Sequence, residues 1–92
     1  MQAEQMKNII PIPMAKLAWA CRRGMLELDI LLGNFLKNKY LDLSNTEQQL
    51  FANLLSHPDP TLLAWLMGHE MPEDETLIAI VKLIREHARI HV

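Results

Sequence analysis

Residues 21–29 read CRRGMLELD, and two helical patterns meet within this stretch. Glycine inside a helix costs about 1 kcal/mol relative to alanine, so Gly24 indicates either a helix end or a place where another backbone comes close. Arg23 and Glu27 are four residues apart and would share a face if both lay on one helix. Charged side chains around exposed backbone suit a surface that contacts another protein.

Two helices are expected to flank Gly24, the first over about residues 14–23 and the second over about residues 25–39. In the second, apolar residues recur at the spacing of one helical face. The residues expected to be buried there are Leu28, Leu32, Phe35 and Leu36. Gly33 interrupts this helix with a poor helix former and could kink it.

A third helix is expected to begin after Ser44 and to run to about residue 56. Ser44 and Glu47 have the spacing of a capping box, in which the serine caps the helix and the glutamate reaches back.

Two shorter signals place the remaining helices. Asp59 followed by Pro60 predicts an N-cap and a first-turn proline, and Gly68 predicts the end of that fourth helix. Pro72 is expected to open the last helix, because the acidic residues that follow it suit the positive end of a helix dipole.

These patterns predict an all-α fold, a compact bundle of about five short helices without a strand. Residues 1–12 are expected to form a flexible N-terminal arm, since Pro11 and Pro13 restrict the chain there. Residues 13–92 are expected to form a single helical domain. We expect a monomer.

Composition argues against several classes of function. The chain has 92 residues, of which 50% are hydrophobic, and a net charge of −2, which argues against nucleic-acid binding. A single cysteine, Cys21, excludes an internal disulfide and a Cys-x-x-Cys metal or redox motif. The sequence has no apolar run long enough to span a membrane and no recognisable targeting segment, so we expect a cytoplasmic, bacterial protein without membrane insertion.

Three sequence blocks resemble one family. The order Arg23-Gly24-x-x-Glu27, followed by Leu-Asp, is similar to the motif of the small FAD assembly (flavinylation) factors of succinate dehydrogenase and fumarate reductase. The blocks LSxxExxLFxxLL over residues 43–55 and DPxLxxWLMG over residues 59–68 resemble the same family in the same order.

The resemblance implies an assembly factor that binds the flavoprotein subunit of succinate dehydrogenase and promotes covalent attachment of FAD to it. The subunit of fumarate reductase is a further candidate partner. FAD would be the cofactor of the client, with none held stably by this chain, and the flavin chemistry would need no catalytic group here. The partner-binding residues implied by the motif and its neighbours are Arg23, Gly24, Glu27, Arg22, Asp29 and Trp19.

Ordinary explanations compete with these assignments. Arg23 and Glu27 could be a surface ion pair without function. Trp65 is expected in the core, whereas Trp19 could flank the motif. Cys21 is expected to pack, because no oriented base is visible for a nucleophile. His87 and His91 are four residues apart, a spacing that can chelate a metal on a helix, but we expect them to be a solvated pair rather than a metal site.

Two other functional classes remain open from the sequence. One is an antitoxin-like regulatory protein that binds a membrane partner. The other is a carrier that binds FAD directly, although a thin helical core leaves little room for so large a ligand.

Overall fold

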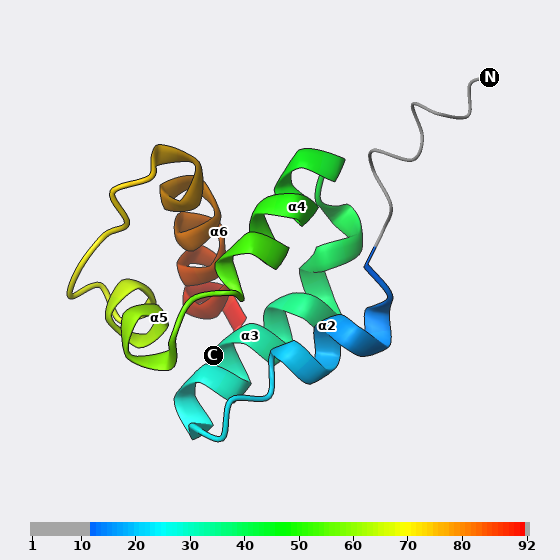
Figure 1. The fold of residues 1–92 in the computed structure, drawn as a ribbon, viewed down its shortest axis with the longest axis horizontal. Helices are drawn as coiled ribbons and strands as arrows, with labels where there is room; N and C mark the ends of the chain where they lie inside the picture. Colours follow the sequence, from blue (N-terminus) through cyan, green and yellow to red (C-terminus); the bar gives the residue numbers. More distant parts are fainter. Residues whose placement is uncertain (1–11, 92) are drawn as a thin grey trace.

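Five α-helices and one 3₁₀ turn make up residues 12–91, the part of the chain described by the computed structural model (Figure 1). In chain order they are α2 (Met14–Ala20), α3 (Leu26–Lys39), η1 (Tyr40–Asp42), α4 (Asn45–Leu54), α5 (Asp59–Leu66) and α6 (Glu75–His91). No strand occurs within these residues, which confirms the predicted all-α fold.

The core forms where α6 packs against α3, α4 and α5. In Figure 1, α6 lies between α5 and α4, and α2 lies alongside α3. The predicted inner face of α3 is buried, and its Phe35 ring lies 5.4 Å from the Phe51 ring of α4. Trp65 is also buried, as expected. Apolar stripes on separate helices thus meet in one core.

Two helix ends follow the sequence signals. At the start of α4, the Glu47 N–H donates to Ser44 Oγ at 3.1 Å, and the Ser44 N–H donates to Glu47 Oε1 at 2.9 Å, which confirms the capping box. After α5, Gly68 adopts φ +83° while the His69 N–H bonds back to the Ala64 carbonyl. This left-handed glycine terminates α5 as predicted.

Other boundaries differ from the predictions. The first helix ends at Ala20 instead of residue 23, and α4 ends at Leu54 instead of residue 56. The last helix begins at Glu75 instead of Pro72 because Asp74 acts as its cap, accepting from the Thr76 N–H at 2.9 Å. Pro72 is buried in the preceding loop.

The prediction that Asp59 is the N-cap of α5 was wrong, and the difference bears on the site. Pro58 occupies the N-cap position of α5, and no side chain caps this helix end. Asp59 is instead the first helical residue, and its carboxylate bonds to another segment of the chain.

The expected N-terminal arm falls outside the described residues except for Ile12. That residue is partly buried and packs against the core, so contacts with the core are already made before α2 begins.

Candidate partner-binding loop

Residues 21–25 connect α2 to α3, and we call them the motif loop. Gly24 lies in this loop with φ +86°, a conformation that residues with side chains rarely adopt. A Cβ built on Gly24 would meet no other atom within 4 Å in the described part of the chain. The positive φ of this turn therefore explains the glycine, and the space where a side chain would lie is open.

Arg23 anchors the motif loop to the connection between α4 and α5. Its Nη1 atom donates to Asp59 Oδ1 at 3.2 Å and to the His57 carbonyl at 3.4 Å, and its Nη2 atom donates to the Leu55 carbonyl. The Arg23 side chain is only 16% exposed. A planar guanidinium can meet several acceptors at once, so Arg23 acts as a clamp within the fold.

Asp29 fixes the other side of the motif loop. Its Oδ1 atom accepts from the Arg23 backbone N–H at 2.6 Å and from the Gly24 N–H at 3.3 Å. Asp29 lies in the first turns of α3, so one carboxylate ties the loop backbone to the start of that helix. These two hydrogen bonds hold the loop backbone against α3.

The remaining motif residues face solvent. Arg22 and Glu27 are exposed, and Trp19 on α2 is 75% exposed. Within residues 12–91, no ion pair joins Arg23 to Glu27, since Arg23 precedes α3 and its guanidinium is engaged elsewhere. The helical face that these two residues would share is therefore not formed.

Cys21 lies beneath the motif loop and is buried, which confirms its expected role in packing. Burial raises the pKa of the Cys21 thiol from 9.0 to about 11, outweighing the opposing effect of the nearby Arg23 charge. The thiol is therefore protonated at neutral pH and is a poor nucleophile.

His87 corrects a further expectation. It is buried, with its ring 5.7 Å from the Phe35 ring in an edge-on arrangement, whereas the sequence suggested a solvated side chain. Among the described residues, no group of three or more metal-ligating side chains comes together. None of the helices within residues 12–91 is long and apolar enough to cross a membrane.

The sequence brought attention to Arg23, Gly24 and Asp29, and the structure joins these three by hydrogen bonds. The clamp acceptors were missed: Asp59 and the carbonyls of Leu55 and His57 lie 32 to 36 residues beyond Arg23. No local pattern marks such partners, although Asp59 and Arg23 both fall in blocks that carry the family resemblance.

The fold and the motif loop define a small helical domain that presents a rigid, glycine-centred loop at its surface. Residues 15–88 match the family described as flavinator of succinate dehydrogenase. The chain belongs to this family.

Curated relatives agree with the family match. A protein of Colwellia psychrerythraea is 46% identical over 87 residues, covering 95% of this chain and 96% of the relative. One from Legionella pneumophila (strain Paris) is 55% identical over 71 residues, covering 77% and 89%. One from Shewanella oneidensis is 50% identical over 74 residues, covering 80% and 90%. Each of the three is named FAD assembly factor SdhE.

Proposed function

We propose that this chain binds the flavoprotein subunit of succinate dehydrogenase and promotes the covalent attachment of FAD to it. The family and the names of its relatives support this activity. The observation that carries the choice of surface is Gly24, which is exposed in a left-handed conformation with open space above it.

In this proposal the motif residues have two kinds of role. Gly24 lets the client backbone approach, and Arg22 and Glu27 supply exposed charges beside it. Arg23 and Asp29 are positioning residues that hold the loop through the bonds described above. A loop held in its binding shape loses little conformational entropy on association, which favours affinity. Trp19 flanks the same surface as an exposed aromatic anchor.

The chain would act by binding alone, without catalytic groups. FAD would remain the cofactor of the client, and the factor would favour the client conformation in which flavin and acceptor side chain can react. The flavoprotein subunit of fumarate reductase is a second client for the same surface. Titration of free FAD against the purified chain tests the cofactor assignment, and saturable binding at micromolar FAD would contradict it.

In-gel flavin fluorescence of the denatured client, from cells lacking the gene and complemented with variants, tests the function. Wild type should restore fluorescence, and Gly24→Arg should not. Gly24→Ala is the matched control because it carries the same backbone strain with little bulk, so it should retain more fluorescence than Gly24→Arg.

The two Gly24 variants should unfold at similar temperatures, because both carry the same backbone strain and a Cβ at this position meets no atom within 4 Å in the described structure. Full restoration by Gly24→Arg would show that the motif loop is not the contact. Fluorescence unchanged by loss of the gene would remove the proposed function.

A further inference from the structure

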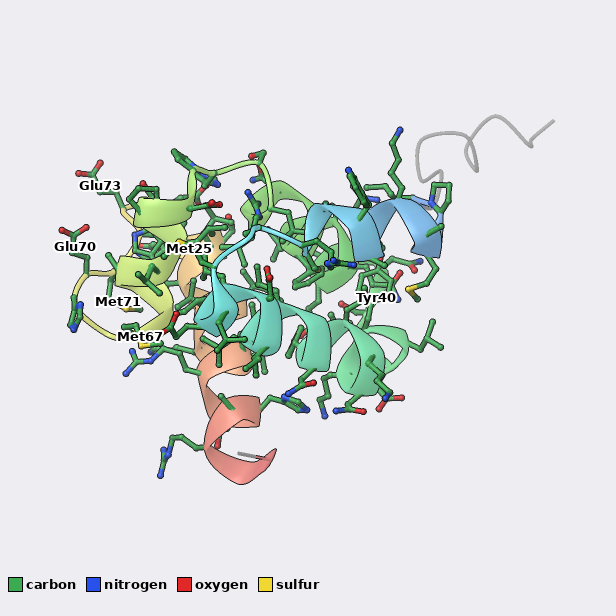
Figure 2. All side chains as sticks on the ribbon, turned by 90° about the horizontal axis from the view of Figure 1, so that it is seen from below. Met25, Tyr40, Met67, Glu70, Met71 and Glu73 are labelled. Carbon is green, nitrogen blue, oxygen red and sulfur yellow. The ribbon has the colours of Figure 1, made fainter. Side chains whose placement is uncertain are left out.

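A groove of about 450 Å³ runs between α2 and α3, beside the motif loop. The two helices lie alongside each other, with Met25 of the motif loop before the start of α3 and Tyr40 just beyond its far end (Figure 2). Cys21 and Leu36 are buried residues in the groove, and its lining is mostly apolar. Ala18 lines it from α2 and Gly33 from α3, so two small residues leave the space between the helices unfilled.

Gly33 is the unusual member of this lining. The α3 helix continues through it from Leu26 to Lys39, so the possible kink is not a break in the helix. Glycine is a worse helix former than alanine, yet a Cβ on Gly33 would meet no atom within 4 Å in the described structure. Packing within residues 12–91 therefore gives no reason for the missing side chain, whereas a partner backbone lying close to α3 would give one.

The groove is continuous with the motif loop. Arg22 and Asp29 both line its loop end, and Asp29 is the residue whose carboxylate holds the Gly24 N–H. Gly33 follows Asp29 by four residues, so the two share one face of α3. A partner segment that contacts Gly24 would therefore reach Gly33 by following this face.

We infer that the groove is the second part of the partner interface and takes an apolar segment of the flavoprotein subunit. This inference rests on the proposed function. The segment lies with its backbone against Gly24 and Gly33 and places apolar side chains over Cys21 and Leu36. The exposed cations Arg22 and Lys37 line the same groove, so an acidic side chain flanking the apolar residues of the client segment would be complementary to them.

Filling the groove tests this inference. The purified chain is titrated by calorimetry with FAD-loaded flavoprotein subunit whose FAD-accepting side chain is replaced, so that binding is measured without the reaction. Gly33→Leu should raise the dissociation constant at least tenfold. Ala18→Leu, on the opposite wall of the groove, should also raise it. Thermal unfolding of Gly33→Leu should occur at or above the wild-type temperature, since leucine favours the helix more than glycine does.

Asn34→Leu is the matched control, because Asn34 is exposed on the same helix and does not line this groove. It should change the dissociation constant less than twofold. Wild-type affinity in both Gly33→Leu and Ala18→Leu, with binding abolished by Gly24→Arg, would overturn the groove assignment and leave the proposed function intact.

Two further outcomes are informative. If wild type does not bind the flavoprotein subunit, the proposed function fails and the groove inference fails with it. If sedimentation shows that the free wild-type chain self-associates and that Gly33→Leu abolishes this, the groove holds a second copy of the chain, which also overturns the inference.

Discussion

Arg23 and Asp59 are 36 residues apart in sequence, and Nη1 of the arginine lies 3.2 Å from Oδ1 of the aspartate. The pair joins the motif loop to the first residue of α5. It also joins two of the three sequence blocks that carry the family resemblance. The arginine of the motif is therefore a structural clamp for the loop.

Arg23→Lys should lower the free energy of unfolding by about 1–3 kcal/mol, because a lysine cannot reach the three acceptors as a planar fork and leaves partly buried acceptors without a donor. Urea denaturation measures this loss. Arg22→Lys is the control, since Arg22 is exposed, and should change stability by less than about 0.5 kcal/mol. Equal stability of the two variants would mean that the clamp contributes nothing.

Asp29→Ala should reduce FAD attachment to the client, because the Arg23 and Gly24 N–H groups lose their shared acceptor and the motif loop is no longer held in one shape. The free energy of unfolding should fall by only about 1 kcal/mol. In-gel flavin fluorescence and a thermal unfolding curve give the two readouts. Asp29→Asn keeps an acceptor oxygen and should retain most of the activity. If Asp29→Asn is as inactive as Asp29→Ala, the negative charge of Asp29, and not its acceptor oxygen, holds the loop.

Stability should fall as pH rises from 9 to 11, in part because of Cys21. The folded-state pKa of its thiol is raised to about 11, so the folded chain keeps a proton that the unfolded chain releases above about 9.0. The contribution is fully present below pH 9 and is lost through pH 11. Chemical denaturation at several pH values measures the slope, and Cys21→Ala should show a shallower decline. An identical slope in both proteins would contradict the burial effect.

Ser44→Ala should destabilise the chain by about 1 kcal/mol, because the Glu47 N–H at the start of α4 loses its acceptor. FAD attachment should persist at temperatures where the variant remains folded, since Ser44 bonds to Glu47 at the start of α4, outside the motif loop. Thr46→Ala, at an exposed position in the same turn, should be nearly neutral. A loss of activity at full stability would instead place Ser44 in the interface.

Local signals in the sequence located most of the fold. The spacing of Leu28, Leu32 and Phe35 identified the buried face of α3, and Ser44 with Glu47 identified the start of α4. Gly68 marked the end of α5. These signals work because helix periodicity and capping depend on residues within a few positions of one another.

Only the tertiary structure decided what the motif residues contact. The acceptors of Arg23 lie between the end of α4 and the first residue of α5, so its role as a clamp depends on how these helices pack. Asp59, predicted to cap α5, bonds instead to this distant arginine. The burial of His87 against Phe35 likewise needs two distant helices to meet.

The sequence by itself determined the all-α fold, the family and the turn at Gly24, because these depend on local patterns and on matching blocks along the chain. The tertiary structure decided that Arg23 faces inward, that Asp29 holds the loop and that a groove lies open over Gly33. The physical reason is that hydrogen bonds between distant segments and the space between two helices exist only after the chain has folded.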